Sequence, residues 1–172
     1  MIKRFTYFAG ALSVFVMGGV VAFGQLASAD SMPSTTQACS YSNTSAQNPL
    51  AGTNWKGSVT FVSGINTGVV EQGNFSYFPG HALYETTDGP VGNYTGVGFW
   101  GQQGDQFCSA FVEPFPGTTN MFVFVKEQGT IASDGQSYTG YGHGQLYQCA
   151  NAQCAAIPGA DGDTVSQMTR QN

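Results

Sequence analysis

The stretch MFVFVKEQGTIASDGQSYTGYGHG, residues 121–144, has the pattern of a strand, a tight turn and a second strand. Its first half is rich in the strand formers Val, Phe and Ile, and Tyr138 and Tyr141 resume the strand pattern after the turn. Asp134 and Gly135 form a residue pair that tolerates the positive φ angles of a two-residue hairpin turn. Comparable apolar runs that end at glycine recur from Trp55 onward, so the sequence predicts an antiparallel β-meander.

The strand pattern continues on both sides of this stretch. About eight short runs of alternating or clustered apolar residues are predicted to be strands: residues 55–62, 69–78, 82–86, 94–102, 106–112, 121–131, 137–148 and 164–170. No window of helical length keeps an apolar i, i+3, i+4 repeat free of glycine, which argues against parallel βαβ units. Because closure removes the exposed edges of a sheet, we predict an all-β fold in which an antiparallel up-and-down meander closes into a barrel, with a β-sandwich as the alternative.

Several predicted strands contain glycines, at Gly96, Gly98, Gly140, Gly142 and Gly144. Glycine lowers strand propensity, and strands tolerate it where they bulge, bend sharply or pass close to another backbone or side chain. The tight corners of a barrel are one such place, so these glycines agree with the predicted closure.

The N-terminus has the order of a secretory signal. Residues 1–29 begin with a basic pair, continue through an apolar segment and end in the small-residue cleavage site ASA. We therefore predict export, to the periplasm or the exterior, with an uncleaved membrane anchor as the alternative. Residues 30–48 are rich in Ser, Thr, Gln and Asn and are predicted to form an irregular arm, and residues 49–172 to form the barrel domain.

The exported chain would be acidic. After cleavage it keeps 3 basic residues, Lys56, Lys126 and Arg170, against 10 acidic ones, which gives a net charge of −7. Phosphate binding needs clustered Lys or Arg, so the composition argues against nucleic acid as a partner. An anionic membrane surface is disfavoured for the same reason.

The four cysteines, Cys39, Cys108, Cys149 and Cys154, all follow the signal. An even number of cysteines in an exported chain indicates disulfides. Of the three pairings, we favour Cys149 with Cys154, which flank a short loop, and Cys39 with Cys108. A zinc site that combines Cys149 and Cys154 with a histidine is the disfavoured alternative, because a second such cysteine pair is missing. No metal and no cofactor is predicted.

Trp55 opens the first predicted strand, in which Trp55, Val59 and Phe61 lie on one face, and Gly52 precedes it by three residues. This opening resembles the start of calycin barrels, the group that contains lipocalins and avidins, where Gly-x-Trp begins the first strand; the spacing here is Gly-x-x-Trp. In lipocalins a basic residue of the last strand packs over that Trp at the closed end. The resemblance implies this barrel-closing role for Trp55 and Arg170, and such a pair contributes about 0.5 to 2 kcal/mol.

The middle of the chain carries a second resemblance. Residues 96–100, 107–111 and 129–140 look like the central hairpins of small bacterial proteins of the lipocalin-like and allene oxide cyclase-like barrel type. The resemblance extends over residues 52–148 as a pattern of strands and turns. Proteins of this type hold a small apolar molecule in the barrel or, in cyclase-like members, shape a reactive substrate in the cavity.

Aromatic residues remain abundant in the predicted domain. Trp100, Phe111, Phe124 and Tyr141 are the candidates for lining an apolar ligand pocket. Alternatively the rings simply fill the interior, because an eight-stranded barrel is just wide enough for side chains alone or for one small ligand. Residues 121–125 are apolar on both faces, which suggests a covered outer face or an association surface.

Glu71 and His143 are the two candidates for acid–base chemistry. Glu71 alternates with Val69, Gly73 and Phe75, so it is a buried carboxylate if these face inward and a surface acid if they do not. His143 lies between two glycines, where an imidazole can face a cavity, but an outward surface histidine is favoured because the sequence shows no partner. The remaining acid–base groups are His81, Glu85, Glu113, Glu127 and a few Asp residues.

Three hypotheses for the function follow. The favoured one is an exported barrel that binds a small, largely apolar molecule reversibly in its interior. The second is a cofactor-independent isomerase or cyclase in which Glu71 or His143 positions a proton or a water in the cavity. The third is a non-catalytic envelope or secreted interaction protein that uses residues 121–125 as its contact surface. The expected assembly state is a monomer or a homodimer.

Overall fold

The computed structural model describes residue 39 and residues 49–90, 92–151 and 153–172, so the predicted signal and most of the predicted arm lie outside the described residues. The chain forms eight strands: β1 (Thr53–Phe61), β2 (Val70–Tyr77), β3 (Ala82–Asp88), β4 (Asn93–Gln103), β5 (Gln106–Pro114), β6 (Met121–Ile131), β7 (Ser137–Ala150) and β8 (Gln153–Gln171). Among the described residues there is no helix that is both long and apolar enough to cross a membrane.

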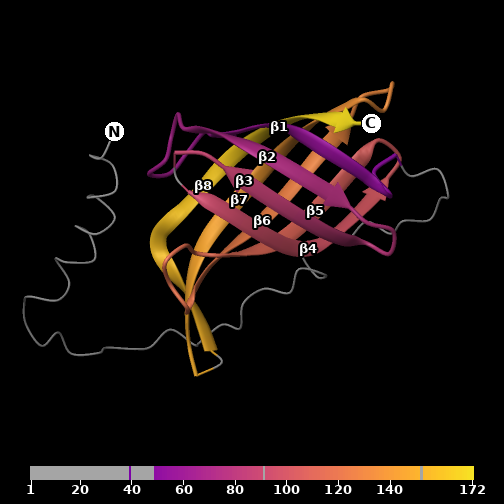
Figure 1. Cartoon of the computed structure of the whole chain (residues 1–172). Helices are drawn as coiled ribbons and strands as arrows, with labels where there is room; N and C mark the ends of the chain where they lie inside the picture. The colour runs from indigo at the N-terminus through magenta and orange to yellow at the C-terminus, as the bar shows by residue number, and fades with distance from the viewer. Residues whose placement is uncertain (1–38, 40–48, 91, 152) are drawn as a thin grey trace, which may run out of the picture.

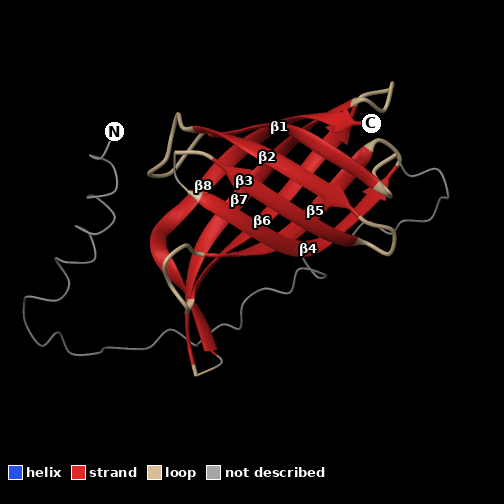
Figure 2. Cartoon of the chain, in the orientation of Figure 1, coloured by secondary structure: helices blue, strands red, loops and turns tan. Residues whose placement is uncertain are grey.

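The strands pair in sequence order, and β1 also pairs with β8, so the sheet closes into an antiparallel barrel (Figures 1 and 2). In the closing ladder, Asn54 to Phe61 of β1 lie opposite Gln171 to Thr164 of β8. This confirms the predicted all-β meander and its closure. Side chains along each strand therefore alternate between the interior of the barrel and its outer face.

The hairpin of β6 and β7 forms as predicted, with one difference at its turn. Of the pair Asp134 and Gly135, only Gly135 has a positive φ angle, 67°. Asp134 Oδ1 instead accepts a hydrogen bond of 2.9 Å from the backbone nitrogen of Gln136. An aspartate that bonds the backbone two residues ahead stabilises the turn, and glycine alone then supplies the left-handed residue.

β8 begins at Gln153, earlier than the predicted residue 164. Residues 158–163 are strand, although their Pro, Gly and Asp content predicted a turn. The register between β7 and β8 shifts between Gln145 and Tyr147. Gln145 Nε2 donates hydrogen bonds to the carbonyl oxygens of Ile157 and Ala160, at 3.0 and 3.2 Å. The residues that break the alternation are thus accommodated in a β-bulge, and β8 continues on both sides of it.

One end of the barrel interior is filled with buried side chains. This closed end is built mainly from Leu50, Trp55, Tyr77, Leu83, Trp100, Phe107, Ile131, Tyr138 and Met168. Their polar tips are paired: Trp55 Nε1 donates to Thr53 Oγ1 at 2.7 Å, and the hydroxyl groups of Tyr77 and Tyr138 lie 3.0 Å apart. Burial raises the pKa of both tyrosines well above the usual value. The closed end is therefore a core of packed, buried side chains.

Two disulfides join Cys39 to Cys108 and Cys149 to Cys154, which is the pairing favoured from the sequence. Cys108 points away from the interior, so the first disulfide fixes Cys39 against the outer face of β5. The second lies near the tip of the ribbon that β7 and β8 form beyond the body of the barrel (Figure 1). Two disulfides point to an oxidising compartment.

Candidate functional site

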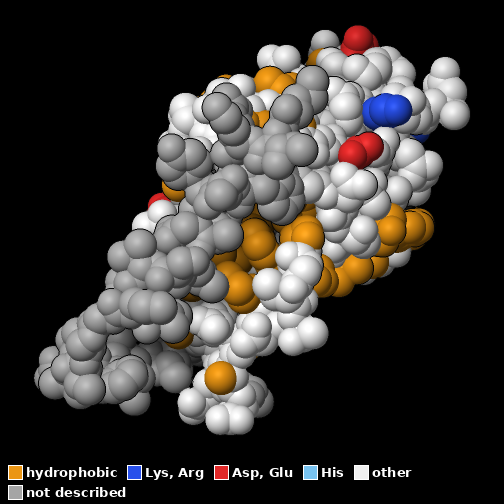
Figure 3. All heavy atoms as spheres, turned by 60° about the vertical axis from the view of Figure 1, so that its left-hand side comes forward, with side chains coloured by type: hydrophobic (Ala, Val, Ile, Leu, Met, Phe, Trp, Pro, Cys, Tyr) orange, Lys and Arg blue, Asp and Glu red, His pale blue; other side chains and the backbone are white. Residues whose placement is uncertain are grey.

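The end of the barrel on the left in Figure 1, beside the β1–β2 loop, contains a cavity of about 150 Å³. Its walls are mostly apolar. The hydrophobic residues that line it are Val59, Phe61, Ile65, Phe75, Phe111, Phe115, Val123, Val125, Leu146 and Ala160. Figure 3, which turns this side forward, shows hydrophobic side chains gathered on this face and few charged ones beside them. The interior therefore has a packed end and a hollow end.

Four glutamates point into the barrel at or beside this cavity. Alternation places Glu71 of β2, Glu85 of β3, Glu113 of β5 and Glu127 of β6 on the inner face, where their exposed fractions are 2%, 0%, 8% and 4%. Glu71, Glu113 and Glu127 line the cavity. A buried carboxylate raises the free energy of the fold unless it is paired or protonated, so four of them in one small barrel require an explanation.

Glycines in the strands make room for these carboxyl groups. A Cβ atom at Gly96 would lie 2.8 Å from Glu85 Oε2 and 3.2 Å from Glu113 Cγ. A Cβ atom at Gly140 would collide with a side-chain oxygen of Glu127. At both positions a neighbouring side chain therefore passes close to the strand, which is one of the reasons for glycine within a strand.

Glu127 is held by two hydroxyl groups. Ser109 Oγ donates a hydrogen bond of 3.1 Å to Glu127 Oε2, and Ser166 Oγ donates one to Glu127 Oε1. Burial nevertheless raises the pKa of Glu127 to about 7, and the two hydroxyl groups oppose this rise. This carboxyl group therefore changes its protonation state near neutral pH.

Glu85 and Glu113 lie side by side across Gly96. Burial, and after it the neighbouring charge of Glu85, raises the pKa of Glu113 well above the usual value. Burial also raises the pKa of Glu85. Thr87 Oγ1 donates a hydrogen bond to Glu85 Oε1, and the carboxyl groups of Glu85 and Glu113 are hydrogen-bonded to each other. Two buried carboxyl groups in contact favour a state with at least one proton between them.

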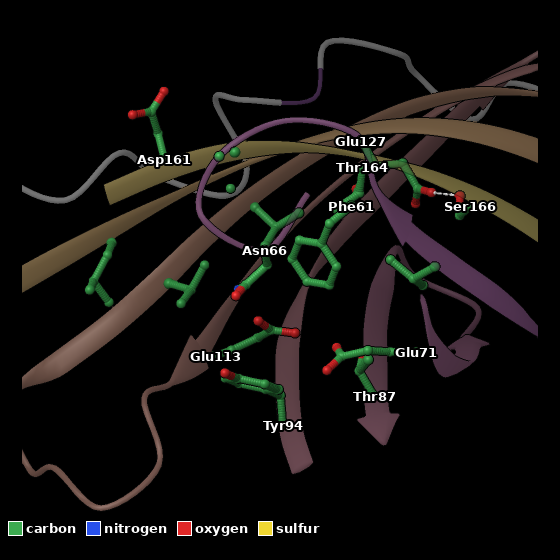
Figure 4. Close-up of a pocket in the computed structure, with 18 of the residues that line it drawn as sticks. Phe61, Asn66, Glu71, Thr87, Tyr94, Glu113, Glu127, Asp161, Thr164 and Ser166 are labelled. Atoms are coloured by element: carbon green, nitrogen blue, oxygen red, sulfur yellow. Dashed lines mark hydrogen bonds between the residues drawn. The ribbon is translucent and has the colours of Figure 1, made fainter. Parts of the chain in front are cut away.

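Tyr94 completes the polar side of the cavity. In Figure 4 the carboxyl groups of Glu71 and Glu113 are turned towards each other near the Tyr94 ring. Burial raises the pKa of Tyr94, and the charges of Glu71 and Glu113 raise it further. The cavity wall contains no Lys, Arg or His among its described residues.

The structure places one of the four candidate aromatic residues in this cavity. Phe111 lines the wall, with its ring centroid 5.9 Å from that of Phe75. Trp100 lies in the closed end instead. Phe124 points to the outer face of β6, where it is only 3% exposed, so that part of the outer face is covered. Tyr141 also points outward and is 67% exposed.

The two acid–base candidates lie on opposite faces of the barrel wall. Glu71 points inward and lines the cavity, which is the buried alternative weighed from the sequence. His143 points outward, and its Nδ1 atom lies 2.8 Å from Asp163 Oδ1. Ser63 Oγ donates a second hydrogen bond to Asp163, and these two contacts lower the pKa of Asp163. This exposed pair is separate from the cavity.

Trp55 and Arg170 lie directly opposite each other in the ladder between β1 and β8. Trp55 is 1% exposed, and its ring centroid lies 5.0 Å from that of Tyr138. The cation–π contact found among the described residues is a different one, Lys126 over the Phe124 ring at 5.8 Å. The barrel-closing role of Arg170 stays a prediction.

In the part of the chain that the structure describes, no group of three or more His, Cys, Asp and Glu side chains is arranged to bind a metal ion. Cys149 and Cys154, the basis of the zinc alternative, are bonded to each other. The carboxyl groups of the cavity can accept hydrogen bonds, balance a positive charge and exchange a proton.

Comparisons of the chain with protein-family models, curated proteins and solved structures gave no match. The closed eight-stranded antiparallel barrel is consistent with the calycin-like fold that the sequence resembles.

Proposed function

We propose that the protein reversibly binds a small, largely apolar ligand in the cavity at the hollow end of the barrel. The observation that carries this proposal is the contrast within one interior, because the closed end is packed and the other end is not. A barrel of eight strands is narrow enough for its own side chains to fill, so a hollow at one end has to be maintained by the sequence.

The size and lining of the cavity support a ligand with one ring. An apolar cavity of about 150 Å³ accommodates a benzene ring. Phe75, Phe111 and Phe115 supply apolar walls, and the carboxyl groups occupy part of the lining. Ligand sites commonly combine a hydrophobic wall with a few polar groups that fix the orientation of the ligand.

An isomerase or cyclase that acts on an apolar substrate is the second candidate. The observation in its favour is Glu127, a cavity carboxyl group whose pKa burial raises to about 7. A general acid or base is most effective when its pKa lies near the working pH. His143, the other candidate from the sequence, points to the outer face, so this proposal would use Glu71, Glu113 or Glu127.

Blocking the cavity tests the proposed binding function. Gly144 of β7 lines the cavity, and a Cβ atom there would make ordinary contacts of 3.5 Å with Val123 and 3.8 Å with Val125. We expect Gly144→Leu to fold and to place its side chain in the cavity. Gln128→Leu is the control, because Gln128 is exposed on the outer face of β6.

The measurement is an NMR titration of the mature chain with four single-ring molecules: ethylbenzene, benzyl alcohol, benzylamine and benzoate. We expect at least one of them to shift the amide signals of cavity residues in the wild type and in Gln128→Leu, and none to do so in Gly144→Leu. Binding that persists in folded Gly144→Leu, or no binding by any of the four molecules, would overturn the proposal.

A further inference from the structure

We propose that the β1–β2 loop, residues 62–69, is a lid over the cavity and that Asp163 of β8 is the latch that holds it closed. This inference rests on the binding function proposed above and adds a regulation of that site, the control of ligand entry and release. Its basis is the position of the loop, which forms part of the cavity wall and is joined to β8 by hydrogen bonds.

The β1–β2 loop covers part of the hollow end of the barrel. Its residues 63–66 line the cavity, and so do residues 160–162 of β8, against which the loop packs. A Cβ atom at Gly64 would lie 2.5 Å from the carbonyl oxygen of Asp161. In Figure 4 the side chain of Asn66 extends from the loop towards the cavity. A ligand that enters on this side of the barrel has to separate the loop from β8.

Asp163 joins the loop to β8 through both its backbone and its side chain. Its carbonyl oxygen accepts a hydrogen bond of 2.8 Å from the backbone nitrogen of Val62, and its backbone nitrogen donates one of 2.8 Å to Ser63 Oγ. Ser63 Oγ in turn donates a hydrogen bond of 2.8 Å to Asp163 Oδ2. Loss of the Asp163 carboxyl group would therefore remove one bond to the loop and leave the backbone contacts in place.

His143 holds the other oxygen of the same carboxyl group. Its Nδ1 atom lies 2.8 Å from Asp163 Oδ1. The hydrogen bonds from His143 and Ser63 lower the pKa of Asp163, so the carboxyl group is ionised at neutral pH and only accepts hydrogen bonds. The proton of the contact with His143 is therefore on Nδ1. With one oxygen held by His143, the other is directed at the loop.

The loop has the features of a segment that opens as a unit. Thr67 Oγ1 donates a hydrogen bond of 2.6 Å to the carbonyl oxygen of Gly64, so the loop keeps a turn of its own. Every residue from 61 to 70 is partly or fully exposed, and Val62 and Ile65 are 48% and 68% exposed. Segments with exposed hydrogen bonds and little apolar burial open at the lowest cost in free energy, and the lids of binding sites are such segments.

The alternative is that the loop is a fixed part of the wall and that the ligand enters elsewhere, for example beside Phe115 of the β5–β6 loop, which also lines the cavity. The two arrangements differ in their kinetics. If the loop is a lid, release of the latch raises the fraction of open molecules, so ligand association and dissociation both become faster and Kd changes little. If the loop is a fixed wall, damage to it raises Kd through faster dissociation alone.

The kinetic test uses whichever of the four single-ring molecules binds the wild type most tightly, with both rate constants taken from NMR line shapes over a titration. In Asp163→Ala and in Ser63→Ala we expect both rate constants to rise about fivefold and Kd to stay within about twofold, as for the loss of an exposed hydrogen bond. The double variant should be no faster than either single one, because both changes break the same contact. Asp105→Ala, which removes an exposed aspartate in the turn before β5, is the control and should leave both rate constants unchanged.

Hydrogen exchange of the ligand-free chain measures the opening of the loop directly. The amide of Val62 is bonded to Asp163 in the closed loop, and its exchange should become about fivefold faster in Asp163→Ala. The amide of Trp100 donates a hydrogen bond of 2.9 Å to the carbonyl oxygen of His81 at the packed end and should exchange as in the wild type.

The outcomes for the two proposals are distinct. If the probe binds but both folded single variants keep the wild-type rate constants, or raise Kd through dissociation alone, the binding function stands and the lid is rejected. Faster ligand exchange without faster hydrogen exchange at Val62, or a double variant clearly faster than either single one, rejects Asp163 as the latch. If none of the four molecules binds the wild type, both proposals are rejected.

Discussion

The two ends of the barrel are built from the same strands and differ in what those strands place inside. β5 contributes Phe107, which is 0% exposed, to the packed end and Glu113 to the hollow end. β6 likewise contributes Ile131 and Glu127. The same alternation of inward and outward side chains therefore builds the hydrophobic core at one end of the barrel and the cavity at the other. The difference teaches that the stability supplied by the packed end offsets the cost of buried carboxyl groups at the other.

The largest expected effect is on folding and comes from the packed end. Trp100→Ala removes a ring that is 1% exposed and should lower the free energy of unfolding by about 3 to 5 kcal/mol. Val123→Ala removes a half-buried side chain next to the cavity and should cost about 1 kcal/mol or less, because no tight packing is lost there. Urea unfolding of both variants measures the difference. Equal losses would show that the two ends do not differ in packing.

The second expected effect is a decrease in stability as the pH rises. The pKa of Glu127 is raised from the ordinary value of 4.5 to about 7 in the folded chain, so the folded state binds this proton more tightly than the unfolded state does. The stabilisation is complete below pH 4.5 and is lost as the pH rises through 7. It amounts to about 3 kcal/mol from Glu127, and Glu113 and Glu85 act in the same direction.

Urea unfolding at pH 5, 6, 7 and 8 measures this dependence. Asp163, whose pKa is lowered, stays ionised over this range and does not interfere. In Glu127→Gln the decrease between pH 5 and 8 should be smaller than in the wild type. A free energy of unfolding that is constant or rises over this range would contradict the burial of ionisable groups at the hollow end.

The fold could be predicted because its signals are local. The alternation along β6 and β7 and the turn glycine Gly135 are properties of neighbouring residues, and closure follows from the cost of exposed edges. The early start of β8 was missed because its bulge depends on Gln145, a residue of the preceding strand. The local Pro and Gly residues predict a turn, but the contact of Gln145 across the two strands overrides this local preference.

The site could be predicted only in part, because it depends on which face of each strand points inward. Glu71 was a candidate, and its burial was one of two alternatives. The sequence shows Glu113 and Glu127 as possible acid–base groups and assigns them no role, although each occupies an inner position in its strand. Their meeting in one cavity depends on the register of β2, β5 and β6, which no single strand reveals.

The smallest expected effect comes from a substitution on the outer face of β7. It tests which face of β7 points into the barrel. Tyr141→Ser replaces a ring that is 67% exposed and should change the free energy of unfolding by less than about 0.5 kcal/mol. It should also leave the binding of the single-ring probes unchanged, whereas Phe111→Leu, in the cavity wall, should alter it. A shift of register by one residue moves every side chain of a strand to the other face. If Tyr141→Ser abolished binding in a folded chain, the inner face of β7 would have to be the one that carries Tyr141. The glycines that make room for the carboxyl groups would then point outward, and the contrast between the two ends of the barrel would no longer hold.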